Sequence, residues 1–300
     1  MPASAPAGQI PVGLLGPAKG ARCDLPVRFI HDTFHGRRQV LAGPGVLAFS
    51  TDYAVNTDGA PNAYDPRDPW GKQGRAINTV CDAVNARTAA GETVDYRQCS
   101  RLIGLFRRAR DAGWSPAAPQ IDFYGAATPA DQGPEAHRPC LQTAGPDAGA
   151  MVSTTSRAAN PGLGRCDQRR YLNALSLPFI IVPGGSRLAA RGMGLGDLAV
   201  VVNPANGRMV YAMVGDTGPQ RGLGEGSVAL NMALLGQTAL PRTRAEARRL
   251  ALPRAFTFVM PGARISRPYT PARIAAAGAA ALDKLGGPAR LRACLDAADR

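Results

Sequence analysis

Short apolar runs separated by glycine, proline and asparagine dominate the pattern of this 300-residue chain. Runs of this length that are rich in valine, isoleucine and phenylalanine predict β-strands. Two of them flank Asn203-Pro204 and Asn206-Gly207, so they predict a strand, a turn and a second strand. The predicted strands lie at residues 45–50, 121–124, 178–183, 198–202, 209–214 and 255–260.

Apolar residues at helical spacing predict helices at 76–87, 97–111, 227–235, 243–252 and 271–285. Ser227 and Thr270 stand where two of these helices begin and are typical N-caps. Strands at the centre with helices around them predict a mixed α+β fold with a mainly β core. We expect an irregular N-terminal extension over 1–40, a central domain over 41–240, and a helical and strand-containing C-terminal extension over 241–300 packed on the same domain.

The chain has 45% hydrophobic and 19% charged residues, as folded proteins do, and a formal net charge of +13. A basic protein is attracted to polyanions. The densest basic segment, 97–110, is interpreted as an amphipathic helix with its arginines in water, with a polyanion-docking face as the alternative. No nucleic-acid-binding motif is present and no apolar run of 18 residues occurs, so neither nucleic acid nor an integral membrane segment is expected. The oligomeric state stays open.

The six cysteines contain no C-x-x-C pair, which argues against a zinc ribbon and favours disulfides. Fifteen pairings are possible. Disulfides indicate a secreted or periplasmic protein. The first twenty residues lack the pattern of a signal peptide, so we expect a leader absent from this chain or a leaderless export route. His31 and His35 flank Asp32, but without a third ligand we interpret them as ordinary polar residues; no metal and no cofactor are expected.

A glycine-rich loop follows the strand at 209–214 and carries Asp216 and Glu225 nine positions apart. Two carboxylates held on such a loop are what hydrolysis of a glycosidic bond requires: one protonates the leaving oxygen, and the other activates water. Taken alone, the same loop is also consistent with two solvated acids at the surface.

Three blocks together resemble glycoside hydrolase family 75, the fungal-type chitosanases. They read YAVNTDGAPNAYDP, then MVSTTSRAANPGLGRCDQRRYLNALSLPFIIVPGG, then GLGDLAVVVNPANGRMVYAMVGDTGPQRGLGEGSVALNMAL, within roughly residues 48–236. The GDTGP and GEGS elements are close to the family's GDTGP and GEAS. The first 40 residues, the tail after about 240 and the high net charge depart from the family.

The resemblance implies a β-barrel core of the double-psi type whose DTG turn presents an acid at the barrel mouth. It implies that Asp216 and Glu225 are the catalytic residues of an inverting enzyme. It further implies sugar binding by residues of the aspartate-rich turn, of the STTS block and of the DTG turn: Asp52, Asn56, Asp58, Ser153, Thr154 and Thr217.

From the residues themselves, we expect Asp216 to be partly desolvated after its apolar strand, which would raise the pKa of its carboxyl and suit a general acid. Glu225 would then be the base, although the opposite assignment is nearly as defensible. The expected reaction is endo-cleavage of a β-1,4-linked amino-sugar polymer. Resemblance favours chitosan, a polycation, whereas the net charge favours peptidoglycan, cut by a muramidase or lytic transglycosylase acting as a secreted antibacterial effector. A non-catalytic cell-wall polysaccharide-binding protein is the second alternative.

Overall fold

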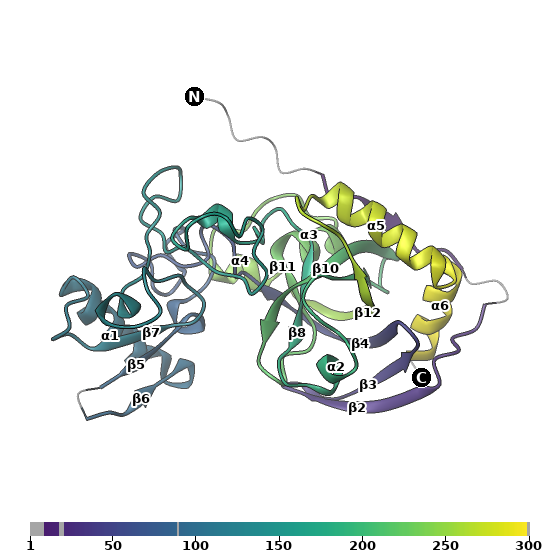
Figure 1. The fold of residues 1–300 in the computed structure, drawn as a ribbon, viewed down its shortest axis with the longest axis horizontal. Coiled ribbons are helices and arrows are strands. Elements are labelled where there is room, and N and C mark those ends of the chain that lie inside the picture. The colour runs from purple at the N-terminus through teal and green to yellow at the C-terminus, as the bar shows by residue number, and fades with distance from the viewer. Residues whose placement is uncertain (1–8, 18–20, 89, 299–300) are drawn as a thin grey trace. The chain divides into compact units, whose positions relative to one another are not determined.

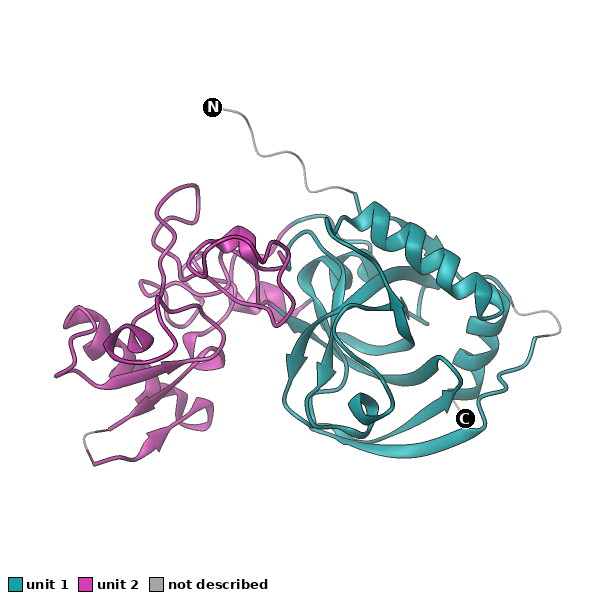
Figure 2. Ribbon diagram, viewed as in Figure 1, with its two compact units in different colours: residues 1–56, 174–239, 250–300 teal, residues 57–173, 240–249 magenta. Residues whose placement is uncertain are grey.

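The protein divides into two compact units in the computed structural model, which describes residues 9–17, 21–88 and 90–298. Unit 1 comprises residues 1–56, 174–239 and 250–300, and unit 2 comprises residues 57–173 and 240–249 (Figures 1 and 2). The chain begins unit 1, builds most of unit 2 over 57–173, and returns to unit 1 except for 240–249. A division between the units falls next to the boundary expected at 240, and none falls at 40.

Six strands of unit 1 form a closed β-barrel. Their order is β11-β8-β10-β9-β12-β4, and β11 pairs with β4 to complete the ring. Inward-facing Val, Ala and Phe side chains from all around the ring fill its core, as the alternation of the strands requires. The strands are β4 (Val46–Asn56), β8 (Phe179–Pro183), β9 (Asp197–Val202), β10 (Arg208–Gly218), β11 (Glu225–Ser227) and β12 (Leu252–Arg264).

Two further strands extend the barrel sheet from β4, where an irregular segment was expected. β2 (Val27–Thr33) and β3 (Gly36–Gly43) form a hairpin, and β3 pairs with the first half of β4. The expectation of an irregular segment over 1–40 is therefore wrong for these residues. Phe29 on β2 is buried in the barrel core cluster, which explains why the hairpin stays on the barrel. A short strand, β1 (Val12–Leu14), pairs with β10.

Four α-helices belong to unit 1 among the described residues. They are α2 (Arg187–Ala190), α3 (Val228–Leu235), α5 (Pro271–Lys284) and α6 (Gly287–Ala298). The Oγ atoms of Ser227 and Thr270 accept the Leu230 and Arg273 N–H groups, so both predicted N-caps are confirmed. A disulfide between Cys23 and Cys294 joins the N-terminal segment to α6.

Unit 2 is built around a small three-stranded sheet, β6-β5-β7, and one long helix. β5 (Val84–Arg87) lies between β6 (Thr93–Val94) and β7 (Gln120–Phe123), and α1 (Cys99–Asp111) packs beside them. The rest is loops with 3-10 turns at 80–82, 96–98, 134–137 and 168–170, together with α4 (Arg244–Arg248). Disulfides Cys81–Cys99 and Cys140–Cys166 both lie inside this unit.

The helix predicted for 76–87 is wrong, because a 3-10 turn and strand β5 occupy that segment. The helices predicted for 97–111 and 271–285 and the six predicted strands are found. Three disulfides are typical of proteins from oxidising compartments, which is consistent with an extracellular or periplasmic location. In the described part of the chain, none of the helices combines the length and apolar character that crossing a membrane requires.

Candidate active site

Asp216 lies on β10, just after a break in its pairing with β8. The register shifts between Val214 and Asp216, and beyond the shift Asp216 pairs with Ile181. A β-bulge of this kind redirects the side chains that follow it, and bulges are frequent beside active sites. The Asp216 side chain is buried, with 6% of its surface exposed, and its Oδ1 accepts the Thr217 N–H at 2.8 Å. Thr217 itself is exposed.

Glu225 is the first residue of β11, where it pairs with Ala54 of β4. The preceding residue, Gly224, has φ +88°, and a Cβ there would stand 2.3 Å from the Asp52 carbonyl oxygen. Only glycine fits this close approach. The Gly224 carbonyl accepts the Ala54 N–H at 2.8 Å, which fixes the register of Glu225 against β4.

Strand β8 lies between the two acidic residues and places them in one row of the sheet. Asp216 pairs with Ile181 on one side of β8, and Gly226 pairs with Ile180 on the other. In the antiparallel β11–β8 pair, Glu225 therefore also stands opposite Ile181. Two strand spacings separate the Cα atoms of Asp216 and Glu225, which amounts to about 10 Å.

Both carboxylates point to the outer face of the barrel wall. A Cβ on Gly226 would meet the ring of Tyr53 in the barrel core at 2.9 Å, so the neighbouring Glu225 points the opposite way. A Cβ on Gly218 would meet Ile181 Cδ1 at 2.5 Å, so Gly218 and Asp216, two residues apart, share the face of the Ile181 side chain. The row Asp216–Ile181–Glu225 thus presents two acids on one surface.

The two acids have different surroundings. Asp216 is buried, whereas Glu225 is half-buried. Burial raises the pKa of the Tyr53 hydroxyl, and the negative charge of Glu225 raises it further. The Glu225 carboxylate is therefore close enough to interact electrostatically with this core hydroxyl. Carboxyl groups of unequal burial can divide acid and base roles between them.

Asp52 and Asn56 lie on β4, each two residues from Ala54, which pairs with Glu225. Every second residue of a strand lies on the same face, so both share the face of Glu225. Asn56 is buried at the end of the strand and pairs with Ser227. Asp52, however, accepts Arg38 Nη2 at 3.0 Å and lies 3.6 Å from His35 Nε2. Its carboxylate is therefore paired with Arg38 of β3 and lies beside His35 of the hairpin turn.

Asp52 also lines a pocket of about 460 Å³ in unit 1 that contains three arginines, Arg37, Arg38 and Arg254. The surroundings of Asp52, which the resemblance implies to bind sugar, are therefore basic. The pocket is formed by residues of β3, β4, β12 and the end of α6.

The other predicted sugar-binding residues, Asp58, Ser153 and Thr154, belong to unit 2. Ser153 is fully buried, and its Oγ accepts the Gly59 N–H while donating to the Gly125 carbonyl. That hydroxyl is used inside the fold and gives no support to a sugar contact. Asp58 accepts the Tyr64 hydroxyl at 2.5 Å, and Thr154 lines a polar pocket.

The loop between the two acids is held by the β2–β3 hairpin, which sequence reasoning missed. Arg221 donates to the Thr33 carbonyl at 2.7 Å, and its guanidinium lies over the Phe34 ring. Buried His31 faces the Gln220 backbone of the same loop, and burial lowers the pKa of its imidazole. The His31 Nε2 atom has no hydrogen-bond partner in the described part of the chain. The HDTFH segment carries no sequence signal for this role, because the role arises only from its contact with the loop in the folded chain.

The aspartate-rich turn contains two buried acids that are structural. Asp68 accepts the backbone N–H groups of four residues between 72 and 76, and Asp65 binds the Arg67 guanidinium. Within the described ranges, no cluster of three or more His, Cys, Asp or Glu side chains could hold a metal ion. In comparisons with protein-family models and with curated proteins, nothing matches this chain.

Proposed function

We propose that the protein is a glycoside hydrolase that cleaves internal bonds of a β-1,4-linked amino-sugar polymer. The observation that carries the proposal is the row Asp216–Ile181–Glu225 on the outer face of the closed barrel. The proposal also takes the barrel to be of the double-psi type, with support from its six closed strands and from Asp216 near the end of β10.

In this mechanism Asp216 is the general acid and Glu225 the general base. Asp216 is assigned as the acid because it is the more buried of the two, and carboxyl groups in unequal surroundings can divide acid and base roles. The more exposed Glu225 is suited to activate a water molecule. A Cα separation of about 10 Å leaves room for that water between the two side chains. An inverting mechanism requires their carboxyl groups to stand about 6.5–9.5 Å apart.

Chitosan is the substrate that the sequence resemblance favours. The specific observation that favours a second candidate, peptidoglycan, is the arginine-lined pocket beside Asp52 together with the net charge of +13. Anionic groups of a cell envelope would be attracted to this surface, whereas a polycation would be repelled at low salt. Peptidoglycan cleavage would be that of a muramidase or a lytic transglycosylase, the latter needing no water-activating base.

The carboxylate variants Asp216→Asn and Glu225→Gln test the catalytic assignment. Each should lower the rate of polymer cleavage at least about 100-fold while leaving the thermal midpoint within a few degrees, because general acid–base catalysis contributes roughly 10²–10⁴-fold. The matched controls Asp111→Asn and Glu135→Gln change exposed carboxylates of unit 2 and should keep full activity. Full activity in either site variant would contradict the role given to that residue.

Product analysis separates the substrates. Incubation with purified chitosan and with purified peptidoglycan, followed by mass spectrometry, identifies the fragments. Release of glucosamine oligomers alone contradicts the peptidoglycan alternative, and anhydro-muramic ends indicate a lytic transglycosylase. Retention on insoluble polymer without new reducing ends would instead support a binding protein without turnover.

A further inference from the structure

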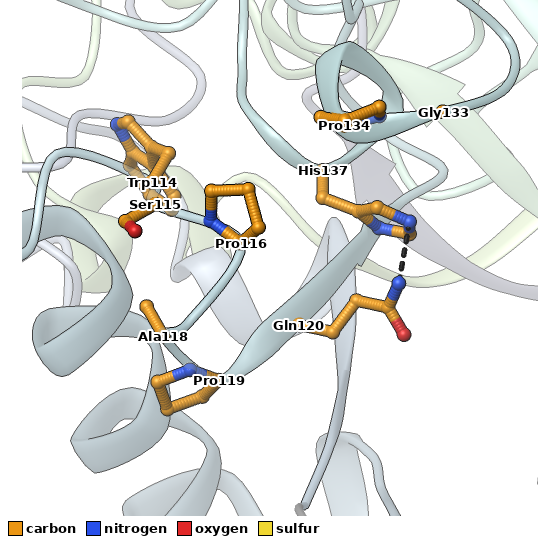
Figure 3. A pocket seen from close by; sticks show the side chains of 9 residues that line it. All are labelled: Trp114, Ser115, Pro116, Ala118, Pro119, Gln120, Gly133, Pro134 and His137. Atoms are coloured by element: carbon orange, nitrogen blue, oxygen red, sulfur yellow. Dashed lines mark hydrogen bonds between the residues drawn. The ribbon is translucent and has the colours of Figure 1, made fainter.

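Two adjoining pockets of unit 2 share Gly133 and His137, and we call the pair the unit 2 groove. Each has a volume of about 390 Å³, which lies in the usual range of small-ligand sites. The first pocket has a mixed lining, whose apolar part is the Trp114 indole with the rings of Pro116, Pro119 and Pro134 (Figure 3). The second is largely polar and contains Thr154, one of the residues that the sequence predicted to bind sugar.

The Trp114 backbone is strained in a way that holds its indole at the groove. Its φ is +60°, the left-handed region, which bulky side chains rarely occupy. The Trp114 N–H closes the end of α1 on the Ala109 carbonyl at 2.8 Å. The indole packs edge-on against Phe106 and Phe123, with ring centroids 5.2 and 5.8 Å away. A tryptophan kept in this conformation is a candidate for ligand contact.

His137 connects the apolar and polar halves. Its Nδ1 lies 3.0 Å from the Ile121 carbonyl oxygen, which accepts the ring proton there. Its Nε2 then accepts from the Gln120 side-chain amide at 2.7 Å, the contact drawn in Figure 3. Gln120 is exposed, so its amide oxygen is available to a ligand beside the Trp114 indole.

The carboxylates of the polar half are already paired with cations. Asp122 accepts Arg87 Nε at 3.0 Å, and Asp131 is bound to Arg165. The groove therefore offers many donors and acceptors with little net charge. Such a site discriminates against a polycation and a polyanion alike and suits a neutral ligand rich in hydroxyl and amide groups.

We propose that the unit 2 groove binds a short stretch of neutral, N-acetylated amino sugars. One apolar face of a sugar ring and the acetyl methyl group would lie on Trp114 and the prolines, and the hydroxyls would reach the polar half. The choice of an amino sugar rests on the proposed function. The groove adds that the bound units carry their acetyl groups, and that binding here uses none of the catalytic acids.

Tryptophan fluorescence tests this directly, because Trp70 and Trp114 are the chain's two tryptophans. The full chain carrying Trp70→Phe with Asp216→Asn and Glu225→Gln reports on Trp114 alone and leaves bound sugar uncut. Titration with an N-acetylglucosamine tetramer should change the emission saturably. A glucosamine tetramer and cellotetraose should bind at least about tenfold more weakly, because they lack the acetyl contacts.

Variants of the groove locate the binding. Gln120→Ala removes the exposed amide and should weaken binding by about fivefold to tenfold, measured by the same titration. Trp114→Ala should abolish the binding seen by calorimetry. Glu135→Gln, an exposed substitution at the neighbouring 3-10 turn that lines neither pocket, is the matched control and should bind as the parent does. Circular dichroism confirms that each variant folds.

The proposal is overturned if the N-acetylglucosamine tetramer causes no change at millimolar concentration, or if the glucosamine tetramer binds equally well. Saturable binding of a proline-rich peptide in place of the sugar would also overturn it. Failure here is distinct from failure of the proposed function. An enzyme dependent on Asp216 and Glu225 without groove binding refutes only the groove, whereas groove binding in an inactive protein refutes only the hydrolase.

Discussion

At the scale of single residues, the site depends on positions where one residue type alone is tolerated. Gly224 is the clearest, since any Cβ would collide with the backbone of Asp52. His31 contributes in a different way, because its buried imidazole faces the loop that joins the two acids. The spacing of Asp216 and Glu225 on a glycine-rich loop suggested these two acids, and the family resemblance implied their catalytic role. The sequence could not predict His31 or Arg221, because their role arises only when β2 is brought against the loop.

Gly224→Ala should destabilise the protein by about 3 kcal/mol or more and displace Glu225, because the substitution combines a left-handed φ with a backbone clash. Urea denaturation and the rate of polymer cleavage measure the two effects. Gly74 also has a positive φ, but open space surrounds its Cβ position, so Gly74→Ala isolates the conformational part at about 1 kcal/mol. Equal losses in the two variants would show that the clash is absorbed.

Acidification should destabilise the native state through His31. Burial lowers the pKa of the folded imidazole below its usual value, so the unfolded chain takes up the proton first. The free energy of unfolding therefore falls as the pH drops below about 6.5, the unfolded pKa.

His31→Gln should reduce the difference in unfolding free energy between pH 7 and pH 5, measured in urea. His35→Gln on the same hairpin changes an exposed imidazole and serves as the comparison. An identical pH dependence in wild type and His31→Gln would refute the assignment.

At the scale of elements, the apolar pattern predicted strands whose own residues are mainly apolar. It failed for segments whose structure depends on contacts with distant parts of the chain. β8 and β9 are mainly apolar and buried along their whole length, and the pattern identified them together with the apolar part of β10. The apolar pattern does not predict β2 and β3, because charged residues such as Arg37 and Arg38 leave few apolar positions in these strands. The segment 76–87 has the apolar spacing of a helix but forms a 3-10 turn and a strand. It is buried on several sides and is tied to α1 by the Cys81–Cys99 disulfide.

Ser227 joins β11 to α3 and should be among the most sensitive polar residues. Its buried Oγ accepts the Leu230 N–H and donates to the Leu177 carbonyl at 2.7 Å. Ser227→Ala should cost about 2–3 kcal/mol, because it removes a cap and leaves buried groups unpaired. Thr270→Ala removes the more exposed cap of α5 and should cost about 1 kcal/mol. Chemical denaturation compares them, and equal costs would contradict the importance of burial.

At the scale of the whole molecule, each disulfide lies within one unit. Cys23–Cys294 closes a separation of 271 residues in unit 1, whereas Cys140–Cys166 closes 26 residues in unit 2. The sequence favoured disulfides but allowed fifteen pairings, because pairing is set by tertiary structure. The division into two units was likewise outside its reach, since the insertion after Asn56 carries no linker-like composition.

Replacing Cys23 and Cys294 by alanine should destabilise unit 1 by about 4–5 kcal/mol, because the unfolded chain regains most of its conformational freedom. Replacing Cys140 and Cys166 should destabilise unit 2 by about 3 kcal/mol for its shorter loop. Hydrogen exchange followed by mass spectrometry measures the change unit by unit. Faster exchange confined to the other unit would contradict the assignment of each bond.

The intervening strand β8 has a consequence for how the proposed enzyme could change. Asp216 and Glu225 stand on either side of Ile181. The backbone hydrogen bonds of the sheet therefore set the distance between their Cα atoms. Exchanging Asp for Glu, or Glu for Asp, changes the reach of a carboxyl group but leaves the Cα spacing unchanged. In the proposed enzyme the sheet holds the Cα atoms of the two acids about 10 Å apart. A switch from inversion to retention, which needs carboxyl groups about 5–5.5 Å apart, would have to come from the reach of the side chains or from moving one acid to another position.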